Sequence, residues 1–171
     1  MLPAMSTSEE AVLVQQRLKS LQTVVLAMGA ALPIIGVVGL VVLPPSELEP
    51  MHLVIAIGVG AAGAIVAHLM TPVLIQPLGR DTDNPVGAGM MRLQSATMTQ
   101  VALAEGGGLV VFALGFVLGI NPILVLIGTV VSSVGVFAVV WPARGRLRRV
   151  RRRLEFEHAS CPLDELAERR T

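Results

Sequence analysis

Four long apolar runs restrict the folds open to this chain more than any other feature of its sequence. They cover about residues 21–43, 53–75, 96–119 and 122–141, and Glu105 is the only Asp, Glu, Lys or Arg inside them. At ~1.5 Å of helix rise per residue, each run can cross a hydrocarbon core of ~30 Å. Because that core offers no water to backbone groups, each run is predicted to be a transmembrane helix.

The distribution of charge predicts how these helices cross the membrane. Only 15% of the residues are charged, against roughly 25% in a soluble domain. All thirteen Lys and Arg precede the first run, separate the second from the third, or follow the fourth, whereas Glu47 and Glu49 lie in an opposite turn. By the positive-inside rule, both termini are predicted to be cytoplasmic.

The predicted fold is therefore an all-α integral membrane protein, a four-transmembrane-helix bundle with both termini in the cytoplasm. Residues 1–20 are predicted to form a cytoplasmic N-terminal helix that continues into the first run. Residues 21–142 form the bundle, and residues 143–171 form a basic cytoplasmic tail. The predicted location is the inner membrane of a bacterium.

Proline and asparagine residues indicate where the predicted helices bend, begin and end. Pro33 removes one backbone hydrogen bond and predicts a bend near Gly29. Residues 79–94 contain several turn formers and are predicted to be a polar connection. At the last reversal, Asn121 is predicted to cap the fourth helix and Pro122 to occupy its first position.

Small residues recur every four positions and predict close helix packing. They are Ala56, Gly60 and Ala64, with His68 continuing the series, then Gly115 and Gly119, and Gly128 and Ser132. In lipid, where packing replaces the hydrophobic drive, small residues at this spacing let helix backbones approach closely. The same faces would suit a homo-oligomer or a membrane-protein partner.

Glu105 is the first candidate for chemistry, because acids inside a membrane are costly and usually face a bundle interior or a wet cavity. One hypothesis is that its carboxyl takes up and releases a proton or cation; the other is that it only locks helices together. His68 is the second polar group at depth. It would face Glu105 and relay a proton, or lie nearer the cytoplasm and bond to backbone or water.

Thr97 and Gln100 continue the polar character before Glu105. They would line a hydrated route from the cytoplasm, or bond to their own backbone, as Ser and Thr often do in helices.

Seven arginines follow the last run: Arg144, Arg146, Arg148, Arg149, Arg151, Arg152 and Arg153. Leu147, Val150 and Leu154 recur at helical spacing among them, which predicts a basic amphipathic helix on the anionic leaflet. Each basic residue there would add ~1 kcal/mol of attraction to anionic lipid headgroups. The alternative is a topology signal alone. Nucleic acid is not an expected partner, because lipid headgroups are the nearer source of phosphate.

No catalytic pattern is present, so the protein is predicted not to be an enzyme and to need no cofactor or metal. The sequence has no Ser-His-Asp order, zinc spacing or phosphate loop. The stretch from Gly58 to Gly63 matches the dinucleotide fingerprint, but it lies inside an apolar run rather than between a strand and a helix.

A resemblance supports the four-helix prediction. Ala102-Leu-Ala-Glu105-Gly, Gly108-Leu109-Val110 and the exit Trp141-Pro142-Ala-Arg144 are similar to sequences in a group of small uncharacterised bacterial inner-membrane proteins. The resemblance covers about residues 92–144 and implies four spans. The same stretch resembles the carboxyl-bearing helix of rotary ATPase proteolipid subunits, where Glu105 would match the ion-binding acid. Length and charged tails depart from that second family, so ring assembly is not expected.

Three functional hypotheses follow from these patterns. The leading one is a non-enzymatic accessory or scaffold protein of the membrane. The second is a proton- or ion-translocating component that uses Glu105, with His68. The third is a protein that binds anionic lipid through its arginine tail.

Overall fold

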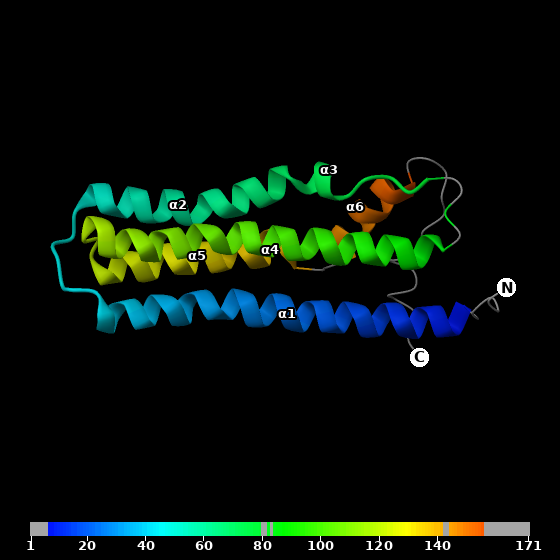
Figure 1. Ribbon diagram of the computed structural model, residues 1–171, viewed down its shortest axis with the longest axis horizontal. Helices are drawn as coiled ribbons and strands as arrows, with labels where there is room; N and C mark the ends of the chain where they lie inside the picture. Colours follow the sequence, from blue (N-terminus) through cyan, green and yellow to red (C-terminus); the bar gives the residue numbers. More distant parts are fainter. Residues whose placement is uncertain (1–6, 80–81, 83, 142–143, 156–171) are drawn as a thin grey trace. The chain divides into compact units, whose positions relative to one another are not determined.

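All regular structure in the described part of the chain is α-helical (Figure 1). The computed structural model describes residues 7–79, 82, 84–141 and 144–155. The helices are α1 (Thr7–Val42), α2 (Pro50–Leu69), α3 (Thr71–Leu74), α4 (Pro85–Leu118), α5 (Pro122–Val140) and α6 (Arg144–Leu154). Four of them, α1, α2, α4 and α5, are long and apolar enough to cross a membrane, as predicted from the four runs.

The chain divides into two compact units. Val24–Thr71 and Thr97–Trp141 form the bundle unit, which holds most of the apolar helical residues. Met1–Thr23, Pro72–Ala96 and Pro142–Thr171 form the terminal unit, which holds α6 and the first turns of α1 and α4.

The core of the bundle unit consists of two apolar clusters. One contains Val25, Leu32, Ala64, Ala67, Val101, Ala104, Val136 and Val140. The other contains Leu43, Ala56, Val111, Ile120, Leu124 and Val125. Large apolar side chains also point outward from all four helices, including Val41 at 84% exposure, Val54 at 68% and Val117 at 77%. Apolar surface of this extent indicates contact with a membrane.

Small residues bring α2 into direct backbone contact with its neighbours, which confirms the predicted close packing for this helix but not for Gly119, where an added Cβ would meet nothing within 4 Å. A Cβ added at Gly60 would lie 2.5 Å from the Gly128 carbonyl oxygen of α5. A Cβ at Gly63 would lie 2.6 Å from the Leu103 carbonyl oxygen of α4. His68, however, is exposed, and the buried stripe passes instead through Ala67.

Two helix boundaries differ from the predicted ones. α2 ends at Leu69 and α3 follows, because Pro72 has no N–H with which to continue the backbone ladder. α4 begins at Pro85, so the predicted polar connection is wrong for residues 85–94. Asn84 caps that helix, its Oδ1 accepting from the Gly87 N–H at 2.8 Å, so the helix begins here although two glycines follow.

The reversal between α4 and α5 has the predicted chemistry. Gly119, with φ of +63°, follows the last residue of α4, a position that favours glycine because it has no Cβ. Asn121 Oδ1 accepts from the Ile123 N–H at 3.0 Å, and Pro122 begins α5. This confirms Asn121 as the cap. Its side-chain amide also donates to the Ser46 carbonyl in the loop between α1 and α2.

Within the terminal unit, α6 buries the face formed by Leu147, Val150 and Leu154, which are 4%, 2% and 0% exposed. The Leu154 carbonyl accepts from the Leu78 N–H at 3.1 Å, so the end of α6 is attached to the segment after α3. Arg92 of α4 donates to the carbonyls of Gln76 and Pro77 in that same segment.

Candidate intramembrane site around Glu105

Glu105 lies in α4 within the bundle unit, partly buried, with Ala104 fully buried beside it. Among the described residues, no hydrogen bond or ion pair reaches its carboxyl group. The acid therefore stands at the edge of the packed interior rather than at its centre.

Ser132 of α5 contacts the turn of α4 that contains Glu105. Its Oγ donates to the Ala104 carbonyl oxygen at 2.6 Å and accepts from the Gly108 N–H at 3.1 Å. Ala104 and Gly108 are four residues apart, so they are the acceptor and the donor of a single helical turn. A side chain that binds both partners of one turn ties α5 to α4 and loosens the turn locally.

The three glycines after Glu105 have different surroundings. A Cβ at Gly107 would lie 2.7 Å from the Val59 carbonyl oxygen, and a Cβ at Gly108 would lie 2.9 Å from Leu32 Cδ2. A Cβ at Gly106 would meet nothing within 4 Å. Two of the glycines therefore permit helix contact, and the open space beside the acid is at Gly106.

Gln100 and Thr97 are buried, at 1% and 0% exposure. The side-chain amide of Gln100 donates to the Ala67 carbonyl oxygen at 3.0 Å and to Thr71 Oγ1 at 2.7 Å. Ala67 lies in the last turn of α2, where carbonyls lack intrahelical donors, so Gln100 satisfies one of them. Gln100 thus joins α4 to the end of α2, a role that neither hypothesis from the sequence included.

His68 lies on the exposed side of α2. Contacts between α2 and α4 place Gly63 against Leu103 and Ala104, and Ala67 against Gln100. His68 is five residues beyond Gly63, or roughly 7.5 Å along the helix. No interaction among the described residues joins His68 to Glu105.

A further polar contact joins α5 to α1 and was not predicted. Ser133 Oγ donates to the Gly29 carbonyl oxygen at 2.6 Å, and Ser133 is 6% exposed. In a regular helix, that carbonyl would accept from residue 33, but Pro33 has no N–H. The signal was present in the sequence as a proline four residues after Gly29, together with a serine in the last apolar run.

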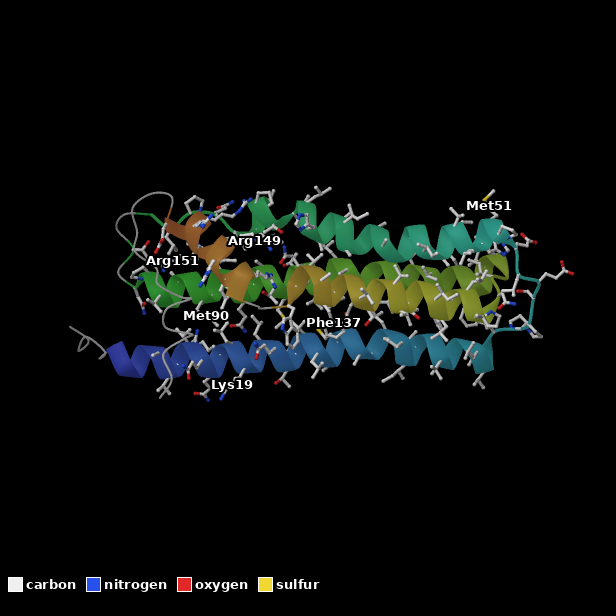
Figure 2. All side chains as sticks on the ribbon, turned by 180° about the vertical axis from the view of Figure 1, so that it is seen from behind. Lys19, Met51, Met90, Phe137, Arg149 and Arg151 are labelled. Carbon is white, nitrogen blue, oxygen red and sulfur yellow. The ribbon has the colours of Figure 1, made fainter. Side chains whose placement is uncertain are left out.

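In the terminal unit, the arginines of α6 fall into two groups. Arg148, Arg149, Arg152 and Arg153 are exposed, whereas Arg146 and Arg151 are partly buried. Arg151 forms an ion pair with Glu155, with 3.0 Å between Nε and Oε1. Figure 2 labels Arg149 and Arg151 on α6. The side chain of Arg144 lies outside the described residues.

Burial, together with the charge of Arg149, lowers the pKa of Arg146 to about 10. That pKa remains far above neutral, so Arg146 keeps its charge and adds to the basic character of the helix.

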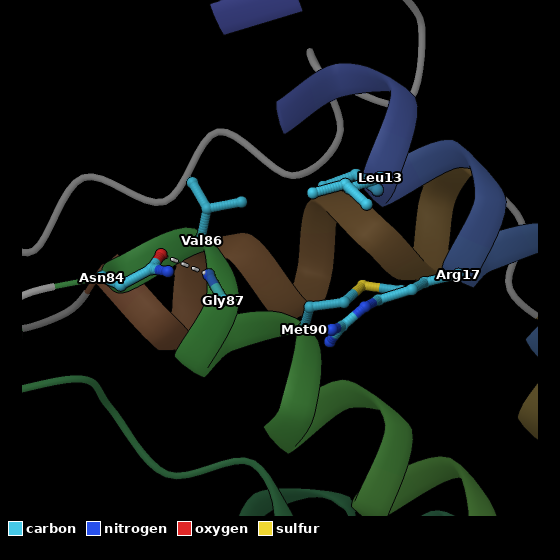
Figure 3. Close-up of a pocket in the computed structure, with 7 residues that line it drawn as sticks. Leu13, Arg17, Asn84, Val86, Gly87 and Met90 are labelled. Carbon is cyan, nitrogen blue, oxygen red and sulfur yellow. Dashed lines mark hydrogen bonds between the residues drawn. The ribbon is translucent and has the colours of Figure 1, made fainter. Parts of the chain in front are cut away.

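A pocket of about 220 Å³ also lies in the terminal unit (Figure 3). Its lining comes from the first turns of α1 and α4: Leu13, Val14, Arg17, Asn84, Val86, Gly87 and Met90. Most of these groups are apolar, and Arg17 supplies the one cationic side chain among them.

No protein-family model, curated protein or solved structure matches this chain. Among the described residues, no group of three or more His, Cys, Asp or Glu side chains could hold a metal ion.

Proposed function

We propose that this protein is a non-enzymatic scaffold of the bacterial inner membrane, a four-span bundle with cytoplasmic termini that self-associates through α4. The observation that carries this proposal is the use of the buried polar groups. Gln100, Ser132 and Ser133 each donate to a backbone carbonyl of another helix. Polar side chains that bond across helices in this way hold a membrane bundle in one arrangement.

The same contacts argue against proton conduction. A relay needs groups that can pass a proton from one to the next, and Glu105 and His68 are the ionisable candidates. His68 is exposed on α2, and the Gln100 amide beside it already donates to Ala67 and Thr71. Among the described residues, no interaction joins Glu105 to a second ionisable side chain that could continue a path.

Self-association would give Glu105 a partner. An acid that faces lipid costs roughly 2.5–3.5 kcal/mol even on the lenient insertion scale. Leu109 and Phe116, which are 48% and 53% exposed, follow Glu105 at helical spacing. Phe112 packs edge-on against Phe116, with 5.4 Å between ring centres. A second copy of the chain could cover this row of side chains on α4. The protonated Glu105 carboxyls of the two copies can then both donate and accept hydrogen bonds.

The test compares Glu105→Gln with Glu105→Leu, using sedimentation in detergent and proton flux in proteoliposomes. We expect no flux from the wild type. We expect Glu105→Gln to retain self-association, because the amide keeps the shape and hydrogen bonding of the acid. Glu105→Leu should weaken self-association by the free energy of one hydrogen bond in a membrane, ~0.6 to ~1.7 kcal/mol.

Two results would reject parts of this proposal. Wild-type flux that disappears in Glu105→Gln, while the bundle stays folded, would support the proton-translocating role instead. A wild type that is monomeric at every protein-to-detergent ratio would reject self-association through α4. His68→Ala further distinguishes the scaffold from the proton-translocating role, because the self-association of a scaffold should not change in this variant.

A further inference from the structure

The arginines of α6 are arranged about the helix so that one face is basic and the other is used inside the protein. The exposed arginines are two pairs separated by four residues, Arg148 with Arg152 and Arg149 with Arg153. At 3.6 residues per turn, these four side chains lie along adjacent rows of one helix face. The opposite face carries Leu147, Val150 and Leu154, all buried.

Burial of the apolar face changes how this helix can meet a membrane. A free amphipathic helix lies in the interface with its apolar face inserted between the lipids. In α6 that face is already buried, and the Leu78 N–H is bonded to the Leu154 carbonyl at the end of the helix. What α6 presents outward is charge, not apolar surface.

The short connection between α5 and α6 keeps this basic face near lipid. α5, an apolar helix able to cross a membrane, ends at Val140, and α6 begins at Arg144. Four residue steps of extended chain span at most ~14 Å. The first turn of α6 therefore cannot be far from the headgroups at the end of that helix. Arginine suits phosphate because its planar guanidinium donates two parallel hydrogen bonds.

We propose that the exposed face of α6, formed by Arg148, Arg149, Arg152 and Arg153, is a binding site for anionic phospholipid headgroups. It binds them by surface charge and hydrogen bonding, without inserting the helix between the lipids. The inference rests on the membrane location included in the proposed function, but not on self-association or on the role of Glu105. It differs from an amphipathic anchor in requiring only the four exposed arginines.

The experiment counts lipids bound to the purified full-length protein in detergent by native mass spectrometry. Phosphatidylglycerol is the probe, and phosphatidylcholine is the zwitterionic comparison. We expect preferential binding of phosphatidylglycerol that weakens as salt rises. Replacing all four arginines with Gln should weaken that binding by at least a hundredfold, because each contributes roughly fivefold near an anionic surface.

Three control variants locate the site. The four-Lys variant keeps the charge and should lose less than about tenfold, since only bidentate pairing is removed. Arg17→Gln with Lys19→Gln removes two exposed basic residues from α1 and should change binding by less than about threefold. Val86→Trp fills the pocket beside Arg17 and should leave binding unchanged.

Equal binding of both lipids, or full binding by the four-Gln variant, would overturn the proposal. Loss of binding in Val86→Trp would place the lipid in the pocket instead and would also overturn it. A single-stranded oligonucleotide that binds the wild type more tightly than phosphatidylglycerol would show that the face is built for nucleic acid. Because the detergent assay measures lipid alone, a failure here leaves the scaffold role to its own test.

Discussion

At the scale of single residues, the polar contacts of the bundle unit compensate for prolines and helix ends. Pro33 leaves the Gly29 carbonyl without its helical donor, and Ser133 donates to that carbonyl at 2.6 Å. In a membrane interior, an unsatisfied carbonyl costs several kcal/mol, so a nearby hydroxyl is strongly favoured. The proline and the serine form one functional pair, although they are 100 residues apart in the sequence.

This pairing gives a double-mutant cycle. Ser133→Ala alone should lower the free energy of unfolding by about 1 kcal/mol, near the middle of the range for hydrogen bonds in membrane proteins. Pro33→Ala restores a backbone donor to Gly29, so adding Ser133→Ala to it should cost much less. The measurement is thermal or denaturant unfolding of all four proteins in detergent. Equal costs of Ser133→Ala in both backgrounds would show that the two residues act independently.

Glu105 could be identified from the sequence, whereas the residues packed around it could not, and the reason is physical. A charge inside an apolar run is visible without any structure, because its cost depends only on depth. The contacts of Gln100 and Ser132 depend on how each helix is rotated about its axis, which depth does not determine. A pairing of Glu105 with His68 was therefore only one of two alternatives open from the sequence, and His68 is exposed. The contacts of Ser132 with the backbone on both sides of Glu105 could not be predicted.

At the scale of helices, glycine positions determine how closely the elements pack. Gly107 faces the carbonyls of Val59 and Gly60 on α2, whereas Gly106, one position earlier, faces open space. The two residues are both glycines and so have the same helix propensity, although only Gly106 is next to Glu105 in the sequence. Only Gly107 is in contact with the backbone of α2.

Substituting each with alanine separates packing from propensity. Gly106→Ala should stabilise the bundle by up to ~1 kcal/mol, because alanine is the better helix former. Gly107→Ala should destabilise it by ~1 to ~3 kcal/mol, since its Cβ would lie 2.7 Å from a backbone oxygen that cannot move alone. Thermal unfolding in detergent measures both. Similar effects of the two variants would mean that α2 and α4 are not in backbone contact here.

Helix boundaries were predictable where a proline and a cap agreed, and not where local signals conflicted. At Asn121 and Pro122 both signals mark the same start, and α5 begins there. At Asn84 and Pro85 the same pair was read as a turn, because Gly87 and Gly89 follow. The helix starts at Pro85 despite the two glycines, which cost ~1 kcal/mol each relative to alanine, because the Asn84 cap acts together with the burial of Met90 and Leu93.

At the scale of the whole molecule, the number of apolar helices followed from the four apolar runs of the sequence, because lipid leaves the backbone few alternatives. The burial of the apolar face of α6 could not be predicted in this way. Its arginines and its apolar stripe both matched a helix that inserts into a leaflet, yet Leu147, Val150 and Leu154 are buried within the protein. A periodic pattern identifies the apolar face of a helix but not which surface covers it.

The proposed orientation in the membrane is based on the distribution of basic residues and can be tested directly. A reporter that is active only in the periplasm should be active when fused after Glu49 or at Asn121, and inactive after Asn84 or at Arg170, because the positive-inside rule keeps arginine-rich segments in the cytoplasm. The four-Gln variant of α6 should give the same pattern, since Arg144, Arg146 and the basic residues before α1 and α4 still mark the inside. Topology depends on the overall excess of basic residues near helix ends, whereas lipid binding depends on one face of one helix. Reporter activity at Arg170 in the wild type would mean either an odd number of crossings or the opposite orientation, and both would reject four spans with cytoplasmic termini.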